Sequence, residues 1–141
     1  MKDNLEPVNG FARSVGYRLT VWQADYAEIE LALKPQHLNR SGVPHGGVIA
    51  TLIDAACGFT GCFCPVPGRV RRCVTLSMTT SFLGQAAAGD TLSAKARRTG
   101  GGKTVFFTRC DLVDSKGQLI ATGEAVYKYR KGSEDPNGVA P

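Results

Sequence analysis

A chain of 141 residues with 43% hydrophobic and 21% charged side chains can bury one core of ordinary size, and this composition excludes an intrinsically disordered protein. The net charge is +5, but no helix-turn-helix, zinc-finger or aromatic RNA-binding signature accompanies the basic residues, so we expect no nucleic-acid partner. No apolar segment approaches membrane-spanning length and the N-terminus has no apolar signal region, which favours an unexported, cytoplasmic protein with no membrane association.

The first third of the chain predicts a short helix and a β-hairpin. Residues 1–13 are polar, with a short helix expected after Pro7. Residues 15–23 and 26–34 alternate in polarity at the period of a strand, and only two residues separate them.

Residues 39–63 hold the most informative pattern, a turn-rich loop that leads through His45-Gly46-Gly47 into an apolar helix. At the helical period one side of this helix is a packing face, and the other consists of small residues around one acid. The packing face is Ile49, Leu52, Ile53, Ala56 and Phe59, and the small-residue face is Gly47, Ala50, Thr51, Asp54, Gly58 and Gly61. Asp54 is the only formal charge between Ser41 and Gly68, and an unpaired carboxylate in such a setting is costly to bury.

The start of this helix is a candidate site for a developing negative charge. The amides of Gly46 and Gly47 belong to the first turn, where N–H groups have no intrahelical acceptor and the helix dipole favours anions. An oxyanion hole could therefore be built here from the backbone alone.

Four further β segments follow a break at residues 64–68 (CPVPG). They are residues 70–83, 90–99, 103–113 and 118–130, and a mobile tail is expected at 131–141. The pattern predicts a single α+β domain over 1–130, a curved antiparallel sheet of five to six strands wrapped around one long helix. An unpaired sheet edge and an uncovered small-residue helix face would both be resolved by a second copy, so we expect at least a homodimer.

The remaining polar candidates are cysteines and basic residues. The five cysteines lack the paired spacing of a zinc site and are expected to be small core residues, with no metal. The basic residues gather in two clusters, which are either solvated surface or a grip for a small polyphosphate. These clusters are Arg69, Arg71 and Arg72, and Arg97, Arg98 and Lys103.

The arrangement N-x5-HGG-x6-D, carried by Asn39, His45-Gly46-Gly47 and Asp54, resembles that of hotdog-fold acyl-CoA thioesterases of the PaaI-like (phenylacetate-degradation type) group. Residues 74–90 (VTLSMTTSFLGQAAAGD) and 111–129 (DLVDSKGQLIATGEAVYKY) resemble the strand-and-turn and the final hairpin of that family.

This resemblance implies hydrolysis of an acyl-CoA, with coenzyme A as part of the substrate and no other cofactor. It implies that Asp54 is the general base or nucleophile, that the Gly46 amide is the oxyanion donor, and that Asn39 positions water or the substrate carbonyl. His45 would support the loop and bond the thioester, and Thr75 would hold the water. The family divides each site between two protomers, usually in a tetramer. Gly47, Arg71, Arg72, Arg97, Arg98 and Lys103 are the expected substrate-binding residues.

Two other functions fit the same residues. One is a hotdog hydratase or dehydratase of acyl thioesters, which would need a histidine and an acid paired across the substrate. The other is a binder of acyl-CoA without catalysis, in which Asp54 would be a structural acid. For each residue taken alone a structural role also remains open, since Asn39 is a good turn residue and Thr75 a normal strand residue.

Overall fold

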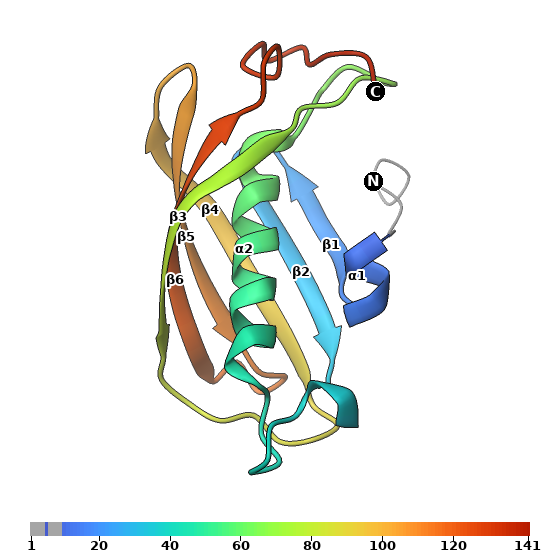
Figure 1. The fold of residues 1–141 in the computed structure, drawn as a ribbon, viewed down its shortest axis with the longest axis vertical. Helices are drawn as coiled ribbons and strands as arrows, with labels where there is room; N and C mark the ends of the chain where they lie inside the picture. The colour runs from blue at the N-terminus through green and yellow to red at the C-terminus, as the bar shows by residue number, and fades with distance from the viewer. Residues whose placement is uncertain (1–4, 6–9) are drawn as a thin grey trace.

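One long helix, α2 (Gly46–Cys62), lies in the concave face of a six-stranded antiparallel sheet in the computed structural model, which describes residue 5 and residues 10–141 (Figure 1). The sheet order is β1-β2-β4-β5-β6-β3. The strands are β1 (Arg18–Gln23), β2 (Tyr26–Ala32), β3 (Cys73–Phe82), β4 (Thr91–Gly101), β5 (Val105–Val113) and β6 (Leu119–Tyr129). This architecture confirms the α+β hotdog fold predicted from the sequence.

The local predictions in the first third agree with the structure. β1 and β2 form the expected hairpin, and Asp25 in its turn has a φ of 65°, a conformation that Asp tolerates better than most residues. A short helix, α1 (Gly10–Val15), lies beside β1, while residues 6–9 are outside the described part of the chain. A 3-10 turn, η2 (Pro35–His37), then leads into the loop before α2.

The packing face of α2 is largely the one that the helical period predicts. Ile49, Leu52, Ile53 and Ala56 are buried against the sheet, and Phe59 is half-buried, with its ring edge-to-face on Trp22 at 5.3 Å. Gly61 is a correction to the predicted small-residue face, because it is buried in the core. A Cβ there would overlap the Phe106 ring, so glycine is needed for close packing rather than for an open face.

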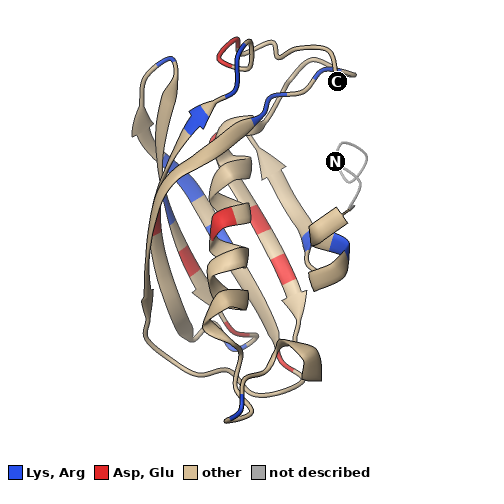
Figure 2. Cartoon of the chain, viewed as in Figure 1, with Lys and Arg blue, Asp and Glu red and all other residues tan. Residues whose placement is uncertain are grey.

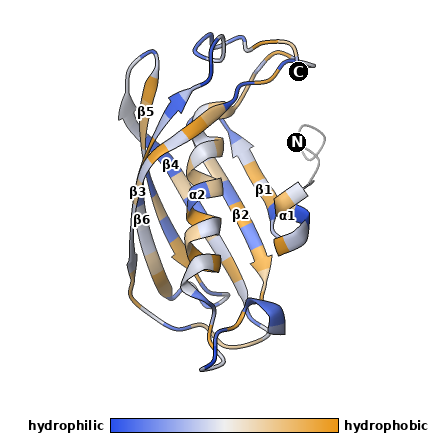
Figure 3. Ribbon diagram, in the orientation of Figure 1, coloured by the Kyte–Doolittle hydropathy of each residue, from blue (hydrophilic) through white to orange (hydrophobic). Residues whose placement is uncertain are grey.

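Strand β3 forms an edge of the sheet and leaves large apolar side chains uncovered. Within residues 5 and 10–141 it pairs only with β6, so its outer backbone edge has no partner strand in this part of the chain. Figure 3 shows hydrophobic segments along it, and its exposed apolar residues are Val74, Leu76, Met78 and Phe82. A long exposed edge with this composition is unusual for a surface that faces only water.

The last eleven residues make specific contacts, which differ from the mobile tail expected at 131–141. Val139 forms an antiparallel bridge with Val70, and the Ser133 side chain is 1% exposed. The Ser133 hydroxyl accepts a hydrogen bond from the Arg72 amide at 2.9 Å, and Arg69 donates to the carbonyls of Asn137 and Gly138. Polar groups of the segment before β3 thus hold the tail, a pairing that its Gly-rich and Pro-containing sequence does not indicate.

Each cysteine is a thiol outside any disulfide, and Cys57, Cys62 and Cys110 are buried as predicted. No helix in the described part of the chain has the length and apolarity needed to cross a membrane.

Candidate active site

Asp54 lies near the middle of α2, where Figure 2 shows an acidic band on an otherwise uncharged helix. Its carboxylate opens into a cavity of about 800 Å³ beside the C-terminal half of the helix. The helix contributes one wall, made of Thr51, Asp54, Ala55, Gly58, Phe59 and Cys62. Three aromatic side chains add to the apolar lining, namely Phe11 of α1, Tyr17 just before β1 and Tyr127 of β6.

Two hydroxyl groups hold one oxygen of the Asp54 carboxylate. The Thr75 hydroxyl donates to Oδ1 at 2.8 Å, and the Tyr127 hydroxyl donates to the same oxygen at 2.9 Å. The Tyr127 hydroxyl also lies 2.7 Å from the backbone oxygen of Asp54. Oδ2 receives no hydrogen bond from any residue that the structure describes.

Tyr127 is a site residue that the sequence reasoning missed. Burial, followed by the nearby Cys57 and Asp54, raises the pKa of Tyr127, so the hydroxyl keeps its proton and stays a donor. Strand alternation in β6 places Tyr127 on the inner face, but only the pairing of Tyr127 opposite Thr75 brings it to Asp54. That register depends on a β-bulge between Thr75 and Ser77, which no sequence signal marked.

The cap at the start of α2 uses the amide of one of the two glycines and leaves the amide of the other for a ligand. His45 is the N-cap, and its Nδ1 accepts a hydrogen bond from the Gly47 amide at 2.8 Å. The Gly46 amide has no acceptor among the residues that the structure describes, so it is the donor left for an anion. The Gly47 amide, predicted to bind substrate, is already used by the cap.

Asn39 organises the loop that leads to the helix. Its side-chain oxygen accepts hydrogen bonds from the amides of Ser41 at 2.9 Å and Val43 at 3.3 Å. The turn role and a site role are compatible, because the side-chain amide nitrogen remains available as a donor.

Asp54 and Gly46 cannot act on one carbonyl group within a single chain. They are eight positions apart on one helix. At the helical rise this separates them by about 12 Å along the axis. A site that uses both groups must take the amide from another copy of the chain.

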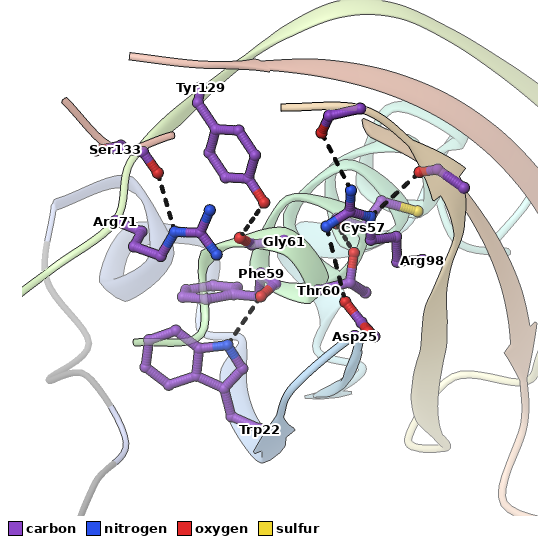
Figure 4. A network of polar contacts seen from close by, with 12 residues as sticks. Trp22, Asp25, Cys57, Phe59, Thr60, Gly61, Arg71, Arg98, Tyr129 and Ser133 are labelled. Carbon is purple, nitrogen blue, oxygen red and sulfur yellow. Dashed lines mark hydrogen bonds and ion pairs between the residues drawn. The ribbon is translucent and has the colours of Figure 1, made fainter. Parts of the chain in front are cut away.

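Three arginines line the same cavity beyond the aromatic wall. Arg71 stacks on the Tyr129 ring at 4.3 Å and donates from Nε to the Ser133 carbonyl at 2.9 Å, which leaves its Nη groups without a described acceptor (Figure 4). Arg72 and Arg130 also line the cavity. Arg71 and Arg72 were predicted, whereas Arg130 was missed because it directly follows the last strand with no motif around it.

Arg97, Arg98 and Lys103 lie outside this cavity. Arg98 is held beside the turn of the β1–β2 hairpin, where it faces Asp25 at 3.9 Å and donates to the carbonyls of Gly100 and Gly102 (Figure 4). Lys103 lines a separate hollow of about 510 Å³ that it shares with the C-terminal segment. The second basic cluster is therefore not part of the Asp54 site within one chain.

Two thiols also face the cavity, Cys62 from α2 and Cys73 from the start of β3. The hydrogen bond from Cys62 lowers the pKa of Cys73 in spite of burial, and Arg130 adds a smaller effect in the same direction. No group of three or more His, Cys, Asp or Glu side chains within residues 5 and 10–141 is arranged to hold a metal ion.

An antiparallel sheet wrapped around one long helix defines the hotdog class of proteins, and in this chain the helix carries one acid and begins at a His-Gly-Gly loop. Consistent with this, the sequence model of the thioesterase superfamily matches residues 41–121, and the chain belongs to that family.

Similar proteins with informative names also include thioesterases. Mouse acyl-coenzyme A thioesterase 13 is 32% identical over 95 residues, which cover 67% of this chain and 66% of that protein. The Escherichia coli PaaI protein of the phenylacetic acid degradation operon superposes with a TM-score of 0.74 at 24% identity, covering 84% of this chain and 83% of its own. A Streptococcus mutans protein solved with bound acetyl CoA superposes with a TM-score of 0.75 at 21% identity, covering 91% and 97%. PaaI and other thioesterases are thus the structural neighbours of this fold.

Proposed function

We propose that the protein hydrolyses an acyl-CoA thioester to a free acid and coenzyme A. The observation that carries the proposal is Asp54, whose carboxylate has one oxygen held by two hydroxyls and the other without a described hydrogen bond, and which lines a cavity of about 800 Å³ together with three arginines. Membership of the thioesterase superfamily supports the reaction class. The mouse relative's activity, as its name states it, supports the CoA thioester as substrate.

The reaction places the thioester carbonyl carbon beside the free oxygen of Asp54. As a general base, the carboxylate takes a proton from water, whose oxygen bonds to the carbonyl carbon while the C–S bond breaks and the thiolate of coenzyme A leaves. As a nucleophile, it forms an acyl anhydride that water then cleaves. Oxygen-18 incorporation into Asp54 in a single turnover would distinguish the two routes.

Charge that develops on the carbonyl oxygen is bound by the Gly46 amide of the partner subunit. The proposal is supported by the helix N-terminus, which offers the Gly46 N–H without a described acceptor and the positive end of the helix dipole. Asn39 lies in the same loop and would donate from its amide nitrogen to the carbonyl or to water. His45 acts through the loop, since its ring caps the helix and fixes the Gly46–Gly47 backbone.

A homodimer, or a tetramer made of such dimers, completes the site. The unpaired edge of β3, with its exposed apolar residues, is the surface on which a second copy would continue the sheet. This arrangement would also cover the small-residue face of α2 and bring the start of one helix toward the Asp54 cavity of the other.

The arginines give the cavity a cationic end suited to the phosphates of coenzyme A. Arg71 is the best prepared, because its stacking on Tyr129 and its bond to Ser133 fix the guanidinium while its Nη groups remain available. Arg72 and Arg130 add charge beside it. Bound acetyl CoA in the Streptococcus mutans neighbour supports this class of ligand.

The test is thiol release from a panel of aromatic, medium-chain and branched acyl-CoAs. Asp54→Asn is nearly isosteric but neither basic nor nucleophilic, so we expect kcat to fall by about three orders of magnitude with a small change in KM. Binding of coenzyme A, measured by calorimetry, should be retained. A wild type that binds acyl-CoA but releases no thiol from any member of the panel would instead indicate a binding protein.

A further inference from the structure

Tyr127 and Thr75 form a cross-strand pair aimed at one atom. They are register partners on β6 and β3, and both hydroxyls donate to Oδ1 of Asp54, at 2.9 Å and 2.8 Å. The Tyr127 hydroxyl also contacts the backbone oxygen of Asp54 at 2.7 Å, so it engages the main chain and the side chain of the same residue.

The position of the Tyr127 hydroxyl is fixed by packing. The ring is 2% exposed and stacks on Phe106 with centroids 5.2 Å apart. Gly58 also lies close to the ring, since a Cβ added there would come 3.4 Å from its Cε1 atom. The ring therefore has little room to move, and its hydroxyl is a stationary donor.

Without such donors the carboxylate could rotate over a wide range of χ2 angles, because the χ2 distribution of Asp is broad and roughly two-fold. Two hydrogen bonds to Oδ1 fix the χ2 angle, and we infer that they direct Oδ2 toward the cavity. Thr75 gives its hydroxyl proton to Asp54, so it can accept from a water molecule but cannot also donate to one. Thr75 can therefore still hold a water molecule, as the family resemblance implied, but only as the acceptor of its hydrogen bond.

We propose that Tyr127 is a positioning residue of the hydrolase, and that with Thr75 it immobilises Oδ1 of Asp54 so that Oδ2 alone attacks the thioester or activates water. This inference rests on the proposed function. It assigns the chemistry to one oxygen and gives β6 a part in a site otherwise built from α2 and β3.

Thr108 provides a control outside the cavity. It is 2% exposed, and its hydroxyl donates to the Ala125 carbonyl of β6 at 2.9 Å. Tyr127→Phe and Thr108→Val thus each remove one buried hydroxyl bonded to a backbone carbonyl. Only the first removes a bond to the Asp54 carboxylate.

The experiment measures kcat, KM and the melting temperature of both variants with the acyl-CoA that the wild type hydrolyses best. We expect Tyr127→Phe to lower kcat about 10- to 100-fold with KM within about two-fold, since misplacement of a reacting group acts on the chemical step. Thr108→Val should keep both constants within about two-fold while losing a similar amount of thermal stability. Equal kcat values for the two variants, at matched stability, would overturn the assignment.

A second pair of variants tests the same idea from β3. Thr75→Val preserves shape and removes the other donor on Oδ1, so kcat should fall, and Thr75→Ser should restore most of it. A fully active Thr75→Val would overturn the two-donor arrangement even if Tyr127→Phe fails to fold. A wild type without thioesterase activity overturns the proposed function and this inference together, whereas an active wild type with unaffected variants overturns this inference alone.

Discussion

Cys73 has a pKa below its usual range, and it lines the cavity in which we place the substrate. The main cause is the hydrogen bond from Cys62, which favours the charged form of Cys73. The thiolate should therefore be present at a pH where an unperturbed cysteine is still a thiol. It should also be shielded whenever coenzyme A occupies that end of the cavity.

We predict that iodoacetamide alkylates Cys73 with a rate that rises through a midpoint below that of a model cysteine peptide, because alkylation follows the thiolate population. Cys62→Ala should move this midpoint upward, since it removes the largest cause of the low pKa. Peptide mass spectrometry across a pH series measures both. A midpoint at or above that of the peptide would contradict the assigned hydrogen bond, and unchanged labelling in saturating coenzyme A would show that the ligand does not reach Cys73.

Individual residues also show where sequence reasoning reaches its limit. Asp54 was predictable, because one charge in a long apolar helix is conspicuous in the sequence itself. Tyr127 was not, because its role depends on which residue faces it across β3 and β6. Arg98 shows a second limit of sequence reasoning. A cluster of basic residues in the sequence does not reveal that one member is held by Asp25 and by carbonyl groups.

At the level of elements, the start of α2 combines a side-chain cap from His45 with a backbone amide, that of Gly46, that has no described acceptor. His45 caps the helix through its own ring and uses the Gly47 amide, while the Gly46 amide stays unused. Gly46 is the first helical residue, where proline is well tolerated because its missing N–H would not have been bonded within the helix. His45, with φ −62° and ψ 138°, already has the extended backbone that precedes proline.

Gly46→Pro should therefore delete the proposed oxyanion donor with little harm to the helix. We expect kcat to fall about 10²- to 10³-fold, the usual cost of one such donor. Gly46→Ala is the matched control, since it keeps the N–H and adds a Cβ about 3.4 Å from the Phe82 ring, as proline also does. It should stay within a few-fold of the wild type. Circular dichroism checks the helix, and similar kcat values for the two variants would remove the Gly46 amide from the mechanism.

The elements themselves were predictable because their patterns are local. The strand segments expected at 70–83, 90–99, 103–113 and 118–130 correspond to β3 to β6, since alternation and turn residues are visible along the chain. The contacts of the C-terminal segment could not be predicted, because they are made with Arg69, Arg72 and Val70, which lie 61 to 69 residues earlier. Gly61 was assigned to the wrong face for a related reason, because only the sheet reveals that Phe106 fills the space beside it.

For the whole molecule, the position of the two proposed catalytic groups on one helix determines how many chains a site requires. Asp54 and Gly46 are held about 12 Å apart by the helix, whatever the surroundings do. The uncovered β3 edge and the small residues of α2 provide the surface through which a second copy could supply the missing amide.

Complementation between two inactive variants tests this shared site directly. In a mixed dimer of Asp54→Asn and Gly46→Pro chains, one site combines both intact groups and the other combines both defects. Random pairing makes half of the dimers mixed, so co-expression of the two variants should restore about a quarter of wild-type turnover. The same fraction is expected for a tetramer assembled from such dimers.

Each variant expressed alone provides the baseline, and size-exclusion chromatography confirms that the mixture assembles. Because a site contained in one chain would carry one of the two defects in every copy, turnover of the mixture would then stay at the baseline. Recovery to about a quarter would require the Asp54 carboxylate and the Gly46 amide to come from different subunits, and would make assembly a condition of catalysis rather than of stability alone.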